Sequence, residues 1–140
     1  MEYILEFKDF IDKNSAYNKK SRKDAEVNNR KLKKRLYKTV KDKENTDISI
    51  FLVNGLYVRN RLCVDYTMGG HPYVYSFIPE NEMWIDNSLP KKDIAIVIQH
   101  ELTEYNYMKY ENMSYYDAHT KASQEEIKTR HVLKSKMKLM

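Results

Sequence analysis

The chain has 140 residues and a formal net charge of +5, with 41% hydrophobic and 32% charged residues. This length suits one hydrophobic core, and the composition excludes a chain that is disordered throughout. The single cysteine, Cys63, excludes an internal disulfide and a zinc ribbon. The N-terminal residues include acids and no basic leader, and no apolar stretch reaches the length of a membrane span. We therefore expect an intracellular protein with no membrane partner.

The charge is distributed unevenly along the chain. Residues 19–44 contain twelve Lys/Arg and four Asp/Glu, residues 127–140 contain five Lys/Arg and no acid, and residues 45–126 contain six basic and twelve acidic residues. Leu32, Leu36 and Val40 recur every four residues, which predicts a thin apolar stripe on a basic helix. Such a segment either binds nucleic acid or an acidic partner, or is a solvated helix or linker. We expect residues 1–45 to form a basic helical arm.

A sheet is predicted in the middle of the chain. Apolar residues alternate over 48–58 around Asn54–Gly55, a pair that indicates a β-hairpin because both residues tolerate positive φ. Further strands are predicted at "RLCVDYTM" (61–68), at "HPYVYSFIP" (71–79) and at Met83–Asp86. Together these segments predict a small antiparallel sheet.

Two helices are predicted after the sheet. Ser88 or Asp93 can cap the first, and its apolar residues recur at helical spacing up to Tyr105. A second helix is expected after a turn at 112–114. The order of elements predicts an α+β fold in which a small antiparallel sheet packs on two C-terminal helices, within a domain at 46–140.

The first of these helices contains the sequence "HELTE", in which His100 and Glu104 project from the same face because they are four residues apart. In the HExxH pattern this geometry lets two side chains bind one zinc while the intervening glutamate reaches the water on the metal. Zinc accepts carboxylate oxygen as well as imidazole nitrogen, so Glu104 is competent in the closing position. Glu101 would then be the general base.

A catalytic zinc needs a third protein ligand, and the second helix offers His119 and Glu126, seven residues apart. The predicted metal ligands are therefore His100, Glu104, His119 and Glu126. A shell this rich in carboxylate also suits iron or manganese. The alternative is that each residue is an ordinary surface or hydrogen-bonded side chain.

Three further residues are secondary candidates. His71 follows Gly-Gly at a predicted strand end, where it would be a ligand, an oxyanion stabiliser or a turn residue. Glu82 and Asp86 lie on one side of an extended strand, where they would orient a ligand histidine or face solvent as plain acids.

Two stretches, "MGGHPYVYSFIPENEMWID" and "IQHELTEYNYMKYENMSYYDAHTKASQEEIKTR", carry a resemblance. They are similar to a group of uncharacterised proteins from phages, plasmids and bacteria that share GGH, IPxxE[IM]WID, HELxE and Y[DE]xAHxxA motifs and a later glutamate. The resemblance spans about Val64 to Arg130. It supplies shared motifs, but these uncharacterised proteins have no assigned reaction. The helix and the strand before it also resemble zincin metallopeptidases. That likeness implies a minimal zincin-like fold, with an edge strand on which an extended substrate pairs.

Three functions compete at this point. The leading hypothesis is a zinc-dependent, peptidase-like hydrolase acting on a peptide or protein. The second is a non-catalytic nucleic-acid-associated or virion protein, in which residues 19–44 and the Lys-rich tail make non-specific phosphate contacts. The third is a host-protein-binding module that uses the acidic middle of the chain. The expected location is the host cytoplasm or the virion.

Overall fold

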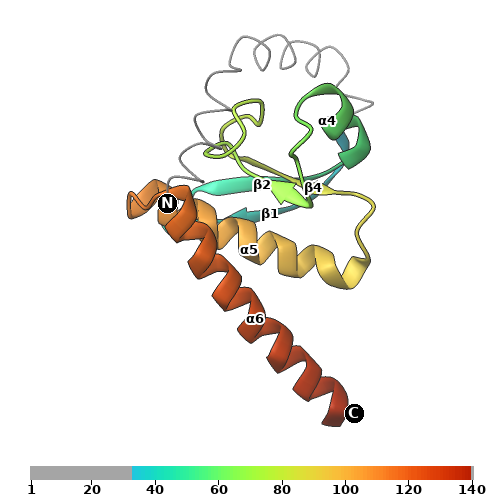
Figure 1. Cartoon of the computed structure of the whole chain (residues 1–140), viewed down its shortest axis with the longest axis vertical. Coiled ribbons are helices and arrows are strands. Elements are labelled where there is room, and N and C mark those ends of the chain that lie inside the picture. Colours follow the sequence, from blue (N-terminus) through green and yellow to red (C-terminus); the bar gives the residue numbers. More distant parts are fainter. Residues whose placement is uncertain (1–32, 140) are drawn as a thin grey trace.

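The computed structural model describes residues 33–139, and their fold is α+β, as predicted (Figure 1). Its four strands form one sheet in the order β1-β2-β4-β3. No helix in this range is long and apolar enough to cross a membrane. In chain order the elements are β1 (Lys33–Lys41), β2 (Asp47–Val53), α4 (Gly55–Arg61), β3 (Gly69–Gly70), β4 (Glu82–Asp86), α5 (Lys91–Tyr110) and α6 (Tyr115–Leu139).

The sheet is mixed rather than antiparallel. β2 pairs antiparallel with β1 but parallel with β4, with Phe51 opposite Trp84, and the two-residue β3 pairs antiparallel with β4. The parallel pair arises because the chain leaves β2 into α4 and two loops before it returns as β4. Parallel neighbours require such a crossover.

The predicted basic helix is wrong over 33–41, where the chain forms β1; residues 1–32 lie outside the described range. A four-residue spacing of apolar residues is weak support for a helix when a strand-forming partner lies close in sequence. That partner is β2, and the turn between the strands is closed by Asp42, whose Oδ1 accepts hydrogen bonds from the backbone of Glu44 and Thr46 at 2.9 Å. The predicted boundary after residue 45 thus falls inside a hairpin.

The hairpin predicted at Asn54–Gly55 is also wrong. Asn54 has φ −79° and caps α4, with its side-chain oxygen accepting a hydrogen bond from the Tyr57 backbone at 3.1 Å. Gly55 has no positive φ either. A Cβ at Gly55 would lie 2.2 Å from Oδ2 of Asp86, so glycine is needed here for a close approach and not for turn geometry.

The strands predicted at 61–68 and 71–79 are not formed: apart from Arg61, the last residue of α4, these segments are turns and irregular chain. Their aromatic side chains are buried on the sheet, as Tyr66, Tyr75 and Phe77 are each at most 6% exposed. Turn hydrogen bonds such as Tyr75 N–H to the His71 carbonyl replace a strand ladder. A high β-propensity reflects how well a side chain fits a pleated, half-buried surface as much as it reflects strand backbone. Here the side chains are buried on the sheet, but their own backbone does not form strands.

Two hydrophobic clusters lie on opposite faces of the sheet. β2 and β4 alternate between them, so that Ile50 and Met83 face α5 whereas Val53 and Trp84 face α4 and the loops. Both strands are therefore buried on both faces, which is typical of central strands that pair in parallel. The face covered by α5 is the one that carries the candidate site.

The two predicted C-terminal helices are confirmed, with the turn at 112–114 between them. Pro90, and neither Ser88 nor Asp93, occupies the N-cap of α5. α6 packs on α5 through Ala118 and Ala122, both fully buried, and its later part projects away from the body of the protein (Figure 1). Small side chains at this contact let the two helix backbones approach closely.

Candidate metal centre

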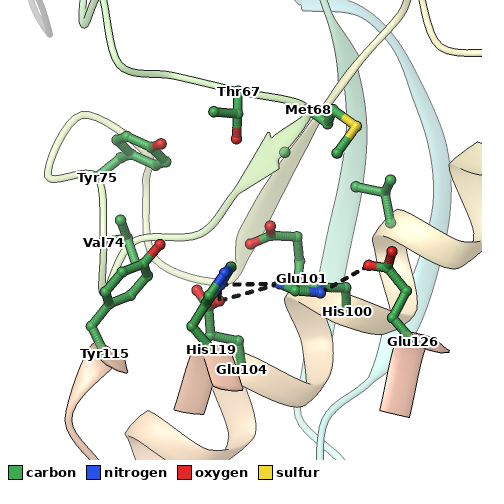
Figure 2. A pocket seen from close by; sticks show the side chains of 12 residues that line it. Thr67, Met68, Val74, Tyr75, His100, Glu101, Glu104, Tyr115, His119 and Glu126 are labelled. Carbon is green, nitrogen blue, oxygen red and sulfur yellow. Dashed lines mark hydrogen bonds and ion pairs between the residues drawn. The ribbon is translucent and has the colours of Figure 1, made fainter. Parts of the chain in front are cut away.

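The predicted helix residues converge at the contact of α5 with α6 (Figure 2). His100 and Glu104 project from one face of α5 because they are one helical turn apart. His119 follows the buried Ala118 on α6 and is thereby brought over the same face. The i,i+4 spacing on α5 and the closely packed α6 together place three potential ligands around one point.

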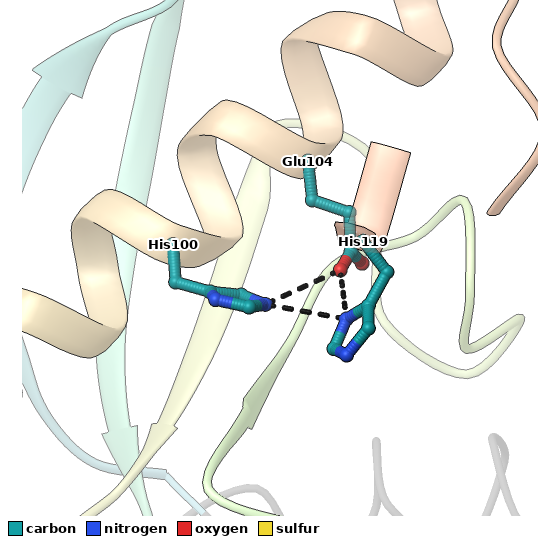
Figure 3. A group of neighbouring side chains, drawn as sticks. All are labelled: His100, Glu104 and His119. Atoms are coloured by element: carbon teal, nitrogen blue, oxygen red, sulfur yellow. Dashed lines mark hydrogen bonds and ion pairs between the residues drawn. The ribbon is translucent and has the colours of Figure 1, made fainter. Parts of the chain in front are cut away.

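Three potential ligand atoms lie close to one another at this point (Figure 3). Nε2 of His100 lies 3.3 Å from Nδ1 of His119 and 3.5 Å from Oε2 of Glu104, and Nδ1 of His119 lies 2.9 Å from the same oxygen. Tetrahedral zinc with bonds of about 2.0–2.1 Å holds its ligand atoms about 3.3–3.4 Å apart. Two sides of the triangle are close to the edge of a zinc coordination tetrahedron, and the third, between His119 and Glu104, is shorter and has the length of a hydrogen bond.

Glu126 lies behind His100, on the opposite side of the imidazole from this triangle. Its Oε1 is 3.0 Å from Nδ1 of His100, a close ion pair that departs from the direction of an ideal hydrogen bond. Its Oε2 accepts a hydrogen bond from Nε of Arg130 at 3.1 Å. A carboxylate on the far nitrogen of a ligating histidine orients the ring and raises its basicity. Glu126 thus contacts His100 on the side where an orienting carboxylate would lie, whereas the sequence predicted a direct ligand.

His71 joins the cluster from the loop after β3, a contact the sequence could only suggest. Its ring is fully buried, and Nε2 lies 2.8 Å from Oε1 of Glu104. Nδ1 accepts a hydrogen bond from the backbone N–H of Tyr73 at 3.2 Å, and the ring meets Tyr105 edge-on with centroids 5.7 Å apart. Each oxygen of Glu104 therefore has its own histidine partner: Oε1 has His71, and Oε2 has His119.

The surroundings of two buried glutamates on the same helix shift their pKa values in opposite directions. Burial raises the pKa of Glu101, and the nearby carboxylates of Glu104 and Glu126 raise it further. Burial also opposes ionisation of Glu104, but hydrogen bonds from His100, His119 and His71 outweigh it and hold the pKa well below its usual range. Neighbouring carboxyl groups with pKa values driven apart are suited to different roles, one as a permanent anion and one as a proton carrier.

A cavity of about 100 Å³ opens beside the three ligand atoms. Glu101 points into it from α5 (Figure 2). This volume admits a metal ion with one or two small ligands. Lining residues that the sequence analysis did not assign to the site are Thr67, Met68, Gly69, Val74, Tyr75, Val97 and Tyr115.

Gly69 of β3 brings the sheet edge directly over Glu101. A Cβ at this position would lie 3.0 Å from Cγ1 of Val97 and 3.2 Å from Cγ of Glu101, so a side chain here would have to push α5 side chains back, and glycine permits the close approach. The Gly-Gly pair before His71 was the sequence feature that could have predicted this close approach. Tyr115, whose ring stacks on His119 with centroids 5.4 Å apart, carried no comparable signal.

Glu82 and Asp86 lie on one side of β4, as expected, but on the sheet face away from α5, which Trp84 shares. Glu82 accepts a hydrogen bond from Nε1 of Trp84 at 3.0 Å. Asp86 pairs with Arg59 at 3.4 Å. Among the described contacts neither acid reaches the histidines. The strand that precedes α5 is also internal to the sheet, and the edge beside the site is β3.

The fold and site define an α+β protein with a partly buried histidine–carboxylate cluster between two C-terminal helices. No family model matches the chain, and neither a curated protein nor a solved structure matches it.

Proposed function

We propose that this protein is a metal-dependent hydrolase in which His100, Glu104 and His119 hold a zinc ion. The observation that carries the proposal is the triangle of ligand atoms at 2.9–3.5 Å beside a cavity lined by Glu101. Three protein ligands with an open fourth position distinguish a catalytic zinc from a structural one. Carboxylate-tolerant iron or manganese are the alternatives for the same ligands.

The roles of the side chains follow from their surroundings. The metal would lower the pKa of a water in the fourth position and polarise a substrate carbonyl. Glu104 is the anionic ligand because its histidine partners favour its ionised form. Glu101 would accept the water's proton and pass it to the leaving group, a role that its raised pKa suits.

An extended peptide is the substrate class that the surroundings favour. β3 is an edge strand of the described sheet and borders the cavity at Gly69. Edge strands present unpaired backbone groups that an extended chain can pair with. A peptide lying there would pass over Glu101.

The test combines metal analysis with turnover. Protein purified without chelator or affinity tag should contain one zinc per chain, and a His100→Ala, His119→Ala double variant should contain none. Glu101→Gln should retain the metal and lose hydrolysis of a fluorogenic peptide library, because an amide cannot accept the proton. Equal metal content in the wild type and the double variant would refute the site, and full activity of Glu101→Gln would refute the base.

A second candidate function rests on the projecting end of α6. Residues 127–138 carry five Lys/Arg and no acid, and nearly all are exposed on a helix that leaves the body of the protein (Figure 1). We propose non-specific binding to nucleic acid by this helix end, together with the basic residues of 19–44, of which 19–32 lie outside the described range. Phosphate binding by several cations gives a steep fall in affinity with salt.

This second function is tested by fluorescence anisotropy with a 20-nucleotide single strand and a duplex at low salt. Replacing Lys134, Lys136 and Lys138 by Glu should weaken binding and reduce the dependence of log K on log salt. No binding to either probe at low salt would contradict it.

A further inference from the structure

His71 is a fully buried imidazole in contact with a proposed ligand, although it lies outside the triangle of ligand atoms. One of its ring nitrogens, together with carboxylate oxygens of Glu101 and Glu104, forms a second group whose atoms lie within 4.8 Å of one another. Two roles are therefore open to it. His71 either binds a second metal ion, with Glu104 bridging, or it holds Glu104 in place.

The hydrogen bonds of the ring decide between these roles. The backbone N–H of Tyr73 points at Nδ1 from 3.2 Å, and a backbone amide can only donate. A nitrogen that accepts a hydrogen bond carries no proton, so the neutral ring must carry its proton on Nε2; this tautomer is assigned from the partners. Nε2 then donates to Oε1 of Glu104 at 2.8 Å and has no lone pair for a metal.

The second-metal role requires the other tautomer. Nδ1 would then carry the proton and face the Tyr73 N–H, leaving two buried donors opposed at 3.2 Å. Opposed buried donors without an acceptor are strongly disfavoured. A flip of the imidazole does not restore the metal role, because it exchanges each ring nitrogen with a carbon and so moves Nε2 away from Oε1 of Glu104.

We infer that His71 is a positioning residue that fixes Glu104 as a one-oxygen metal ligand. By holding Oε1, it leaves Oε2 directed at the histidines of the triangle, 2.9 Å from Nδ1 of His119. A carboxylate without this partner is free to rotate or to bind through both oxygens, which would occupy the open coordination position. The inference rests on the proposed metal site and adds to it the reason that the fourth position stays open.

The first experiment is carried out on the full chain loaded with Co²⁺, whose visible absorption is intense in tetrahedral sites and weak at higher coordination. His71→Phe should weaken Co²⁺ and Zn²⁺ binding by about 10- to 100-fold in a chelator competition, the range for partners of metal ligands. Its Co²⁺ band should also lose intensity. His71→Gln keeps an N–H donor and should recover most of both properties, and His131→Phe on the exposed end of α6 is the matched control.

A second measurement needs no variant. Nitrogen-15 NMR of the zinc-loaded wild type should show His71 with a protonated Nε2 and an unprotonated Nδ1. The opposite tautomer, or two metals per chain falling to one in His71→Phe, would overturn the inference in favour of a ligand role. Unchanged affinity and spectrum in a folded His71→Phe would also overturn it. A wild type that binds no metal removes the proposed function as well, whereas metal binding with the wrong tautomer removes this inference alone.

Discussion

Replacing Glu104 by glutamine tests the proposed metal site, because it converts one oxygen of a proposed ligand into an NH₂ group. The carboxylate accepts from His71 at one oxygen and from His119 at the other. A glutamine has one oxygen and one NH₂ group. Because the Nε2–H of His71 can only be matched by an acceptor, the amide oxygen should face His71 and the NH₂ group should face the histidines of the triangle. That group has no lone pair for a metal, yet it can donate to an imidazole nitrogen.

The expected loss can be estimated from the number of ligands. Structural zinc sites with four ligands bind with about 10–16 kcal/mol, so one ligand contributes about 3 kcal/mol. This corresponds to a rise in Kd of about 100-fold. The metal-free protein should change much less, because the amide retains partners on both sides; the loss of one charge-assisted hydrogen bond costs about 1.5–3 kcal/mol and is partly offset by no longer burying a charge.

Two assays separate these effects. Competition with a chromogenic chelator gives Kd for zinc, and thermal unfolding with and without zinc gives the stabilisation by binding, about 2.7 kcal/mol when free metal is 100 times Kd. Glu104→Gln should lose nearly all of the zinc-dependent shift while remaining folded without metal. Glu125→Gln, on α6 and lining a different cavity with Thr103 and Tyr107, is the control and should behave as the wild type. Wild-type zinc affinity in Glu104→Gln would refute the assignment of this carboxylate as a ligand.

Three other changes probe the surroundings of the site. Glu126→Gln should raise the Kd for zinc by about 10-fold, because Glu126 orients His100 and does not bind the metal itself. A loss of affinity as large as that of Glu104→Gln in the chelator competition would instead make Glu126 a ligand. Gly69→Ala should destabilise the fold by about 1–3 kcal/mol in urea, because its Cβ would lie 3.0 Å from Cγ1 of Val97 and 3.2 Å from Cγ of Glu101 on α5, and unchanged stability would show that β3 can move away from α5. Asp42→Asn should cost about 1–3 kcal/mol at pH 7, because its carboxylate accepts hydrogen bonds from Tyr110 and the backbone. Burial opposes ionisation of Asp42, but these hydrogen bonds outweigh it and lower the pKa of the carboxyl group. The stabilisation is therefore present above the unfolded pKa of about 3.9 and is lost as pH falls through the lower folded pKa. The difference between wild type and Asp42→Asn in urea unfolding should therefore shrink below about pH 4, and a constant difference would contradict this origin.

Asp42 also shows how the hairpin is tied to the site helix. Its Oδ2 accepts a hydrogen bond from Tyr110 at 2.5 Å and lies 3.5 Å from Nζ of Lys109, both in the last turn of α5. The first strand pair is thereby fixed to the C-terminal end of the helix that carries the proposed ligands. Nothing in the sequence indicated this contact, because its partners are more than sixty residues apart.

The parts of the site that lie on a single helix could be predicted from the local residue pattern. The spacing of His100 and Glu104 implies a shared face once a helix forms, and a short turn before α6 makes the next helix an antiparallel neighbour. The alternation of β2 likewise predicted a strand, and the overall α+β order followed. These features depend on residues only a few positions apart, so a local pattern is enough to reveal them.

The contacts between distant segments depended on how the described elements pack. Glu82 and Asp86 are an even number of residues apart, which places them on one side of β4. The packing of the sheet decided which of its faces α5 covers. Asn54 could begin a turn or cap a helix, and the packing of α4 on the sheet selected the cap. His71 reached Glu104 across 33 residues because the edge strand and its glycines approach α5. Such contacts depend on chain segments that share no local pattern, so the positioning of the ligand was fixed by packing.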